Sequence, residues 1–416
     1  MGRAEVIERY LGGATDVAFQ MFDGSTAGPE DAPVRLRLTS PRALSYLATA
    51  RGDLGLARAY VTGELEVDGD LYIALARLSR MDLDLPVAAR VRLLRELGGV
   101  KLLRRPPLPE QEVRRLPGRR HSKARDQQAI AHHYDVSNKF YRLILGPSMA
   151  YTCAVYPTAD ATLEQAQWTK HDLVARKIGL RPGMRLLDVG CGWGGMVMHA
   201  AREYGVRALG VTLSRRQAEW AQKAIAEAGL SELAEVRHLD YRDVPEGEFD
   251  AISSIGLTEH IGLAQLPSYF RFLYDRLRPG GRLLNHCITL YSNQEAVRRG
   301  WFIDRYIFPD GELTGAGRIV SEMHDTGFEV RHEENLREHY ARTTAAWSAN
   351  LDAHWDEAVA EVGLPKARIW RLYLAGVRVG FEQNHIQLHQ VLGVKLHPDG
   401  TSGMPLRPDW EPPAPA

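Results

Sequence analysis

The sequence predicts a doubly wound α/β domain with a mostly parallel sheet and, before it, a smaller α+β or helical N-terminal domain. Two observations predict the sheet: short apolar runs alternate with helical segments from about residue 126 to 345, and a glycine-rich turn directly follows the first run. A third predicts the smaller domain, because 416 residues are long for one domain.

The elements of the sheet follow one another in order. Residues 184–189 (MRLLDV) form a continuous apolar run, which is typical of a strand buried on both faces. The turn GCGWGG and a helix through Tyr204 come next. Further strands are expected at 206–213, 235–239, 250–255 and 282–290, with helices at 215–228 and 267–277.

The flanking regions differ in pattern. Residues 1–80 mix a strand at 34–38 with helices at 42–50, 54–60 and 72–78, and residues 81–125 are rich in arginine and proline, which indicates a linker. The catalytic domain is expected to span 126–395. Its C-terminal part contains two amphipathic helical segments, 343–362 and 366–392, and residues 396–416 are expected to form a flexible tail.

Overall charge identifies no partner, because lysine plus arginine equal aspartate plus glutamate at 52 each. Locally, Arg90–Arg125 contains twelve basic residues against three glutamates. The three cysteines are scattered without C-x-x-C spacing, so we expect neither a disulfide framework nor a metal site, and a cytoplasmic location. Neither a signal peptide nor a transmembrane segment is expected from the hydropathy pattern.

The glycine-rich turn indicates a nucleotide-type ligand. It contains Gly190, Gly192 and Gly194 at the junction of a strand and a helix, where backbone N–H groups are free to bind. The same turn satisfies G-x-G-x-x-G, the NAD-binding pattern, which also requires an acidic residue after the second strand. That strand ends Val-Thr-Leu-Ser214 instead. The glycines alone therefore leave the cofactor open, and purely structural glycines are a further alternative.

Nine motifs in order make the chain resemble the cyclopropane-fatty-acyl-phospholipid synthase family, which includes the mycolic acid cyclopropane synthases. The resemblance runs from about residue 126 to 395 and is loose over the first 80 residues. It implies a Rossmann-like class I methyltransferase fold. The motifs are HHYDVSNKFY (132–141), MAYTCAVYP (149–157), LLDVGCGWGG (186–195), GVTLSRRQ (210–217), DYRD (240–243), SIGLTEHIG (254–262), RLLNHCITL (282–290), RYIFPDGEL (305–313) and HYARTTAAW (339–347).

The resemblance implies S-adenosylmethionine as cofactor, held by a Thr-x-Ser-x-x-Gln segment in place of the missing acid. By the same matching, residues 186–194, with Asp188, should cradle its methionine and ribose portion. The adenine should lie against a separate motif. The implied cofactor-binding residues are Tyr151, Thr152, Asp188, Gly190, Gly192, Gly194, Thr212, Ser214, Gln217, Asp240, Tyr241 and Arg242. Ser214 alone is equally well explained as a helix cap.

The chemistry implied by the family is methyl transfer to the cis double bond of an unsaturated phospholipid acyl chain. An alkene is a weak nucleophile, and its attack on a sulfonium methyl leaves a carbocation. Proton loss from the new methyl closes a cyclopropane, whereas a hydride shift gives a methylene- or methyl-branched chain. Both outcomes need a base, an apolar wall and negative charge near the cation.

A bound bicarbonate ion is implied as the base. In the family, the glutamate of an E-H-x-G motif helps to hold it, and here Glu259 and His260 are expected to close the fourth strand at the carboxyl edge of the sheet. The other implied ligands are Cys153, His286, the backbone of Ile288, and Tyr340. Each of these has a plain structural alternative, as a small buried hydrophobe, a core histidine or a packing residue.

Two further points concern the same site. Trp193, Trp301, Tyr306 and Phe308 are candidates for stabilising the cation through their ring faces, although each is more simply explained as core or tunnel lining. Many relatives carry a cysteine in the C-terminal helix, and this chain has Val377 in that segment, which excludes a covalent cysteine there.

The expected partners follow from this chemistry. Arg90–Arg125 is expected to bind an anionic membrane surface at its inner face, with a solvated linker as the alternative. The helices of residues 42–78 suit either lipid headgroups or a homodimer contact. A nucleic-acid substrate is not expected, since broad basic surfaces and an Asn/Asp-Pro-Pro-Tyr motif are missing. A noncatalytic lipid- or nucleotide-binding protein is the rival from a different class.

Overall fold

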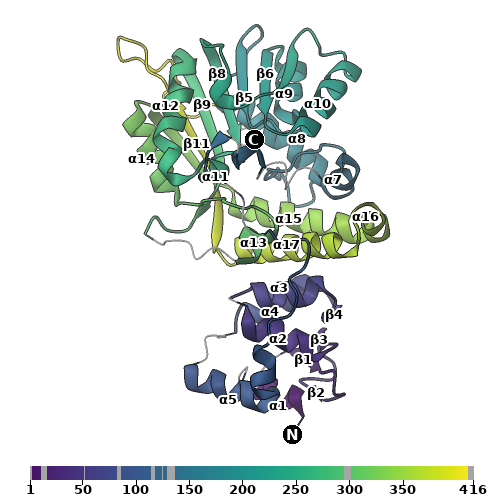
Figure 1. Ribbon diagram of the computed structural model, residues 1–416. Coiled ribbons are helices and arrows are strands. Elements are labelled where there is room, and N and C mark those ends of the chain that lie inside the picture. Colours follow the sequence, from purple (N-terminus) through teal and green to yellow (C-terminus); the bar gives the residue numbers. More distant parts are fainter. Residues whose placement is uncertain are drawn as a thin grey trace. The chain divides into compact units, whose positions relative to one another are not determined.

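The computed structural model describes residues 2–10, 16–50, 52–81, 86–113, 118–123, 125–128, 136–294 and 301–410. The chain divides into two compact units, each described here by itself (Figure 1). Unit 1 comprises Met1–Arg115, Arg298–Pro309 and Leu351–Val379. Unit 2 comprises Leu116–Val297, Asp310–Asn350 and Gly380–Ala416.

Unit 1 is built on a four-stranded sheet in the order β2-β1-β3-β4. In β3, Val34, Leu36 and Leu38 are buried and alternate with half-buried arginines, so one face of the strand packs on helices. The expected strand and three helices of this region are present. The elements are α1 (Arg3–Tyr10), β1 (Val17–Gln20), β2 (Thr26–Ala27), β3 (Val34–Leu38), α2 (Pro41–Thr49), α3 (Leu54–Val61), β4 (Leu65–Gly69), α4 (Leu71–Leu78), α5 (Val87–Leu97), the 3-10 helix η1 (Gly99–Leu103), α13 (Trp301–Tyr306) and α16 (Trp355–Val362).

Residues 81–125 contain more structure than the expected linker. Val87–Leu97 forms helix α5, which packs against α1: Arg3 Nε donates to the carbonyl oxygen of Leu97 at 3.0 Å, and Arg9 forms an ion pair with Glu96. Leu97 and Leu102 are buried and supply apolar contacts of the kind that proline-rich linkers lack. Part of the basic stretch is therefore held on unit 1.

Unit 2 contains the expected doubly wound sheet. Its seven strands have the order β10-β11-β9-β8-β5-β6-β7, and all pairs from β9 to β7 are parallel. The elements are α7 (Asn138–Leu145), α8 (Leu163–Lys177), β5 (Arg185–Val189), α9 (Gly195–Tyr204), β6 (Arg207–Thr212), α10 (Arg215–Glu227), β7 (Ala234–His238), η2 (Tyr241–Asp243), β8 (Phe249–Ile255), α11 (Thr258–Ile261), η3 (Leu263–Gln265), α12 (Leu266–Arg276), β9 (Leu277–Leu290), α14 (Ala316–Thr326), β10 (Glu329–Asn335) and β11 (Ile386–Val394).

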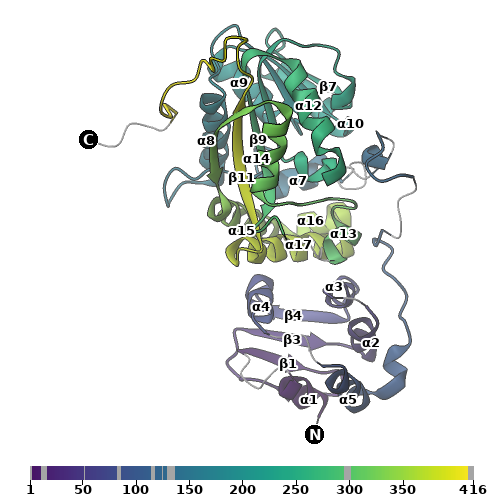
Figure 2. The same ribbon diagram turned by 90° about the vertical axis from the view of Figure 1, so that its left-hand side faces the viewer.

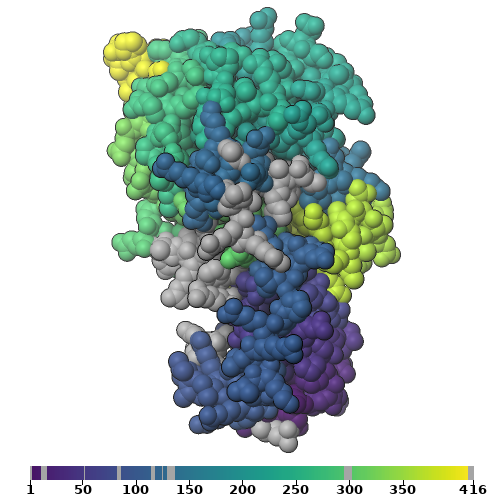
Figure 3. Space-filling model, viewed as in Figure 1, coloured from purple at the N-terminus to yellow at the C-terminus, as the bar shows by residue number. Residues whose placement is uncertain are grey.

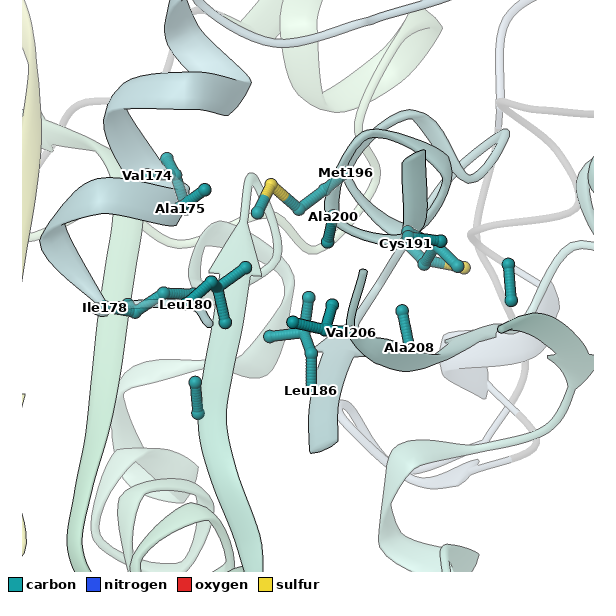
Figure 4. Close-up of a cluster of buried hydrophobic side chains, with 14 of the residues drawn as sticks. Val174, Ala175, Ile178, Leu180, Leu186, Cys191, Met196, Ala200, Val206 and Ala208 are labelled. Carbon is teal, nitrogen blue, oxygen red and sulfur yellow. The ribbon is translucent and has the colours of Figure 1, made fainter. Parts of the chain in front are cut away.

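Helices cover both faces of this sheet (Figures 1 and 2). On one face, α8 and α9 contribute Val174, Ala175, Met196 and Ala200 to a cluster that includes Leu186 of β5 (Figure 4). On the other face, α12 and α14 cover the alternate side chains of the same strands. Burial on both faces explains why the strands appear in the sequence as unbroken apolar runs.

The C-terminal segments differ from the expectation. The first expected helix is divided at His354 into α15 (Arg337–Ala353) and α16, and the second, 366–392, is helical only in α17 (Leu364–Glu382). The chain turns at Asn384, whose φ of 59° is left-handed, and continues as β11. That strand lies antiparallel between β9 and β10. Pairing on both edges stabilises the strand against the helical pattern of its sequence.

The expected flexible tail is attached to unit 2 at several points within its described part, although most of its side chains are exposed. Trp410 is only 3% exposed and joins the cluster on the α8 face, and the Arg176 guanidinium donates to its carbonyl oxygen. Arg331 likewise donates to Ser402 at 3.2 Å. These C-terminal residues, yellow in Figure 3, cover part of the surface of unit 2. Across the described ranges, no helix combines the length and apolar character needed to span a membrane.

Candidate functional site

Two adjoining recesses lie at the carboxyl edge of the sheet in unit 2, and Gly190, Gly192, Gln217 and Gly256 line both. The loop after β5 turns back because Gly190 and Gly192 have left-handed φ angles of 73° and 54°. The N–H groups of Gly190 and Cys191 donate to the carbonyl oxygen of Val211 at 2.9 and 3.0 Å, which holds the loop against the end of β6.

Besides Gly190 and Gly192, the first recess is lined by four more of the expected cofactor-binding residues: Thr212, Gln217, Tyr241 and Arg242. The Thr212 hydroxyl donates to Oε1 of Gln217 at 2.8 Å and so orients the amide. Tyr241 packs its ring edge-on against two aromatic rings beneath it, with centroids 5.4 Å apart in both cases. An apolar floor with a polar rim of this kind suits a flat heterocycle.

Three expected cofactor residues have supporting roles instead. Ser214 caps α10 by accepting from the Gln217 N–H at 3.3 Å, as the helix-cap alternative predicted. Gly194 lies where an added Cβ would come within 3.2 Å of Ala221, so it allows helices α9 and α10 to pack closely. Asp240 accepts three hydrogen bonds from Arg242 at 2.6 to 2.9 Å and thereby fixes that side chain. None of the three lines either recess.

The second recess contains Tyr151, Thr152 and Asp188, as expected, together with two residues that the sequence did not predict, Lys170 and His171. Lys170 is 1% exposed, and its ammonium donates to the Thr152 hydroxyl at 3.0 Å and lies 2.8 Å from Nε2 of His171. The buried cation lies in the pocket that also holds the expected ligands of an amino-acid moiety.

Burial controls the charges in this recess. Desolvation lowers the pKa of Lys170 and raises the pKa of Asp188, which accepts from Ser253 at 2.6 Å. The two groups attract each other, and this attraction opposes both shifts. For His171, burial and the neighbouring Lys170 lower the pKa well below 6.5, so the imidazole is neutral.

Glu259 lies beyond β8 and not in it, on the short helix α11. Its Oε1 accepts from the N–H of Ile288 at 2.7 Å, while Oε2 is buried and has no hydrogen-bond partner among the described residues. Burial raises the pKa of this carboxyl from 4.5 to about 7. Glu259 can therefore both hold and accept a proton near neutral pH. The Ile288 N–H, expected to bind an ion directly, is already donated to this carboxyl.

The other expected catalytic residues lie around the end of β9 and the start of α15. His286 is fully buried, contacts Gln390 at 3.2 Å through Nδ1, and has a pKa well below 6.5 because of desolvation. The Leu336 carbonyl oxygen accepts from the N–H of Tyr340 at 3.0 Å and from Sγ of Cys153 at 3.7 Å. Burial raises the pKa of the Cys153 thiol, which keeps it a neutral weak donor.

The residues that line the two recesses and the expected catalytic residues are linked through the backbone. Gly256, which lines both recesses, donates its N–H to the carbonyl oxygen of His286 at 2.8 Å. Thr152 of the second recess directly precedes Cys153, and His260 of the first recess directly follows Glu259. The structure thus places the expected cofactor site and the expected catalytic residues side by side at one edge of the sheet.

Aromatic rings surround this edge. Tyr340 stacks on Phe381 with centroids 4.4 Å apart, and Trp347 lies 5.3 Å from Tyr151 and 6.0 Å from Tyr340. Of the four expected rings, only Trp193 lines a described recess. Tyr306 and Phe308 belong to unit 1, where the Tyr306 hydroxyl donates to Glu112 and Phe308 packs on Tyr373. The Trp301 side chain and residues 132–135 of the first motif lie outside the described structure.

The recess residues that the sequence analysis did not predict differ in how far a sequence pattern could have identified them. Lys170 and His171 share the buried stripe of α8 with Ala166, Gln167 and Val174, a spacing that marks buried polar residues on an apolar helix face. Asp126, which lines the first recess and accepts from Arg242 at 3.0 Å, has no such pattern. Its position depends on a pairing across 116 residues of chain.

Comparison with known proteins gives consistent results. The family model of mycolic acid cyclopropane synthetase matches residues 121–391. A probable fatty acid methyltransferase of Mycobacterium tuberculosis is 55% identical over 99% of both chains, and one of Pseudomonas putida is 41% identical over 84% of both. The cyclopropane mycolic acid synthase 2 of Mycobacterium leprae is 35% identical over 64% of this chain and 94% of its own.

Solved structures give the same result. A cyclopropane synthase from Mycobacterium tuberculosis superposes with a TM-score of 0.61 at 35% identity, covering 65% of this chain and 98% of its own. A mycolic acid cyclopropane synthase complexed with SAH and CTAB gives a TM-score of 0.61 at 34% identity, covering 64% of this chain and 97% of its own. The resemblance inferred from the sequence motifs and the predicted fold class are confirmed.

The raised pKa of Glu259 predicts a pH-dependent stability. Between pH 4.5 and about 7 the unfolded chain ionises this group while the folded chain keeps it protonated, so wild-type stability falls as pH rises through that window. The loss amounts to roughly 3 kcal/mol. Glu259→Gln has no carboxyl group at this position and so does not lose this stability. The variant should therefore gain stability relative to wild type as pH rises. Denaturant unfolding at several pH values measures this gap, and a gap constant from pH 4.5 to 8 contradicts the assignment.

Proposed function

This chain belongs to the mycolic acid cyclopropane synthetase family and is an S-adenosylmethionine-dependent methyltransferase, and from this premise we propose that it methylates the cis double bond of an unsaturated phospholipid acyl chain to form a cyclopropane. The observation that carries the proposal is the buried Glu259 carboxyl, held by Ile288 beside the glycine-lined recesses. It supplies an acid–base group in an environment from which water is largely excluded.

The two recesses suit S-adenosylmethionine, which supplies a methyl group on a positively charged sulfur. Thr212, Gln217, Tyr241 and Arg242 would hold the adenosine part in the first recess. Tyr151, Thr152 and Asp188 would hold the amino-acid part in the second recess. Burial lowers the pKa of Lys170 there to about 7, and a bound carboxylate would favour its charged form. Gly256, which lines both recesses, leaves no room for a side chain, because an added Cβ would lie 2.9 Å from the Thr152 side chain.

The environment of Glu259 suits the carbocation that an attacked alkene becomes. Tyr151 lines the second recess with Trp347 packed beside it, and aromatic rings stabilise a cation without accepting a covalent bond. The Glu259 carboxyl balances positive charge, and its pKa of about 7 allows it to take part in proton transfer at neutral pH. Apolar and aromatic surroundings also protect the cation from water, which would trap it as an alcohol.

We propose that a bicarbonate ion binds near Glu259 as an additional proton acceptor. Two buried polar atoms, Oε2 of Glu259 and Nε2 of His286, have no hydrogen-bond partner among the described residues. A protonated Glu259 and a neutral His286 can both donate to an oxyanion, and Cys153 and Tyr340 can add donors. Ile288 then acts indirectly, by orienting Glu259.

A branched product is the second candidate. If a hydride shift precedes proton loss, the same cation gives a methylene-branched chain or a methyl-branched chain that keeps a double bond. The similarity to two probable fatty acid methyltransferases, one covering 99% of both chains, supports this alternative. Both candidates share the substrate class and the residues proposed above.

Access to lipid is proposed through an exposed surface of unit 1 formed by α5, η1 and the following residues, at the inner face of the cell membrane. Apolar side chains stand out there: Val87 is 76% exposed, Val100 83% and Leu103 51%. Basic residues alternate with them at Arg90, Arg92, Arg95, Lys101, Arg104 and Arg105. A mixed apolar and basic surface is complementary to an anionic bilayer, and each basic residue near the surface contributes about 1 kcal/mol.

The cofactor assignment predicts binding of S-adenosylhomocysteine, with NAD bound weakly or not at all. Gly256→Ala should lower the affinity at least tenfold, because the new methyl group would displace Thr152. Gly229→Ala is the matched control, since Gly229 has a similar φ of 67° and open space around it. Isothermal titration calorimetry measures the affinity of wild type and of both variants for each ligand. Tight binding of NAD alone, or equal affinity in Gly256→Ala and wild type, rejects the assignment.

The base assignment predicts that Glu259→Gln reduces methyl transfer by roughly 10²–10⁴-fold while S-adenosylhomocysteine binding stays intact. Glutamine preserves the acceptor for Ile288 but removes the negative charge and the exchangeable proton. Mass spectrometry of oleoyl phospholipid after incubation with purified enzyme should show a gain of one CH₂ for wild type and for Glu322→Gln, a buried glutamate of α14. Near-normal turnover by Glu259→Gln would place the base elsewhere.

The membrane surface predicts salt-sensitive binding to vesicles containing anionic lipid. Replacing Arg92, Lys101, Arg104 and Arg105 with alanine should weaken binding, whereas the same charge change at Arg181, Arg207, Arg216 and Lys223 should not. Arg114 and Arg115 lie outside the described residues, and Arg120 is already paired with Asp310 at 2.9 Å. Sedimentation with vesicles measures binding. Equal binding by both variants at all salt concentrations would assign the stretch to a plain structural role.

A further inference from the structure

A row of buried polar side chains leads to Nδ1 of His286, the ring nitrogen opposite Nε2, which has no hydrogen-bond partner in the described parts of the chain. Gln390 of β11 is the cross-strand neighbour of His286 in β9, and its amide lies 3.2 Å from Nδ1 of that residue. The other end of the amide accepts from the ammonium of Lys177 at 2.8 Å. Lys177 also pairs with Glu334 of β10. Three adjacent elements of the sheet and helix α8 therefore meet at one line of hydrogen bonds.

The donors and acceptors in this row determine one another. A lysine ammonium has only donors, so the Gln390 atom that faces Lys177 must be the carbonyl oxygen Oε1. The amide nitrogen Nε2 then faces His286, and an amide nitrogen can only donate. Nδ1 of His286 must accept this hydrogen bond and cannot carry a proton. In a neutral imidazole, the remaining proton lies on Nε2.

We infer that Lys177 and Gln390 are positioning residues that fix His286 in its neutral Nε2–H tautomer and so present a hydrogen-bond donor at the catalytic edge. The inference about tautomer stands on the hydrogen bonds alone. Its consequence for methyl transfer rests on the proposed function, in which Nε2 donates to the proton acceptor or to a charged oxygen beside Glu259.

Burial explains why such a device is needed. His286 and Gln390 are 0% and 1% exposed, so solvent does not interconvert the tautomers by exchanging partners. Desolvation and the positive charges of Lys170 and Lys177 keep the imidazole neutral. Without a fixed donor at Nδ1, the proton would distribute between the two nitrogens, and a fraction of the molecules would present a lone pair toward the site. Repulsion from an oxyanion would then replace attraction.

The test is Gln390→Glu. A carboxylate still accepts from Lys177 with one oxygen, but its other oxygen can only accept, which forces the proton of His286 onto Nδ1. Nitrogen NMR of protein labelled with ¹⁵N-histidine distinguishes the two tautomers, and the signal lost in His286→Gln identifies the residue. We expect the Nε2–H form in wild type and the Nδ1–H form in Gln390→Glu. Gln387→Glu, on the same strand and paired with Asn384, is the matched control.

Activity provides the second readout. Gln390→Glu should lower methyl transfer by roughly 10–100-fold, as is typical when a residue that orients an active-site histidine is replaced. Affinity for S-adenosylhomocysteine should not change, because Gln390 lines neither recess. Lys177→Met, which frees the amide to turn over, should add the Nδ1–H form to the spectrum and lower activity as well. Thermal melting checks that each variant is folded.

The outcomes separate the two hypotheses. An Nδ1–H tautomer in wild type, or an Nε2–H tautomer retained in folded Gln390→Glu, overturns the positioning role. A wild-type protein that binds S-adenosylhomocysteine but methylates no lipid overturns the proposed function and leaves the tautomer result standing. A tautomer change without loss of activity rejects the catalytic consequence.

Discussion

The site depends on a difference in length between two adjacent strands. β8 ends at Ile255, opposite His286, while β9 continues to Leu290. On the side of β8, the described part of β9 beyond His286 has only an isolated parallel bridge, from Leu290 to Gly315. Its next backbone donor there, the Ile288 N–H, would be buried without a partner, which costs free energy of the order of 1–3 kcal/mol. Glu259 of α11 supplies the acceptor. A backbone requirement of the fold thereby draws a carboxyl group into a buried position at the edge of the sheet.

The properties of the site follow from that burial. Burial raises the pKa of the carboxyl group to about 7, although the hydrogen bond from Ile288 to one oxygen acts in the opposite direction. The other oxygen has no hydrogen-bond partner among the described residues. The same edge carries the glycine loop, where small residues let a ligand approach the backbone, and aromatic rings that tolerate a cation. Desolvation, helped by the nearby Lys170 and Lys177, lowers the pKa of His171 and His286 and keeps both imidazoles neutral. Glu259 can therefore carry a negative charge near neutral pH, whereas the neighbouring imidazoles stay uncharged.

Much of this could be predicted from the sequence because it depends on local patterns. The strands from Arg185 to Ile255 appear as apolar runs, and the glycine turn marks the end of the first. What could not be predicted depends on distant pairing. Strand β11 has a sequence compatible with a helix and becomes a strand only between β9 and β10. Gln390 consequently lay inside an expected helix, and its contact with Lys177 spans 213 residues. The supporting role of Asp240 likewise becomes visible only once the position of Arg242 is known.

The central claim is that a methyl group passes from S-adenosylmethionine to a carbon of a lipid acyl chain and loses one of its hydrogens at this edge of the sheet. The most direct measurement supplies purified protein with S-adenosylmethionine carrying a CD₃ group and with vesicles of an oleoyl phospholipid, followed by mass spectrometry of the acyl chains. The account predicts chains heavier by one CD₂ unit, because the third deuteron leaves as the ring closes. Acyl chains that contain no deuterium after the methyl donor has been consumed would contradict it.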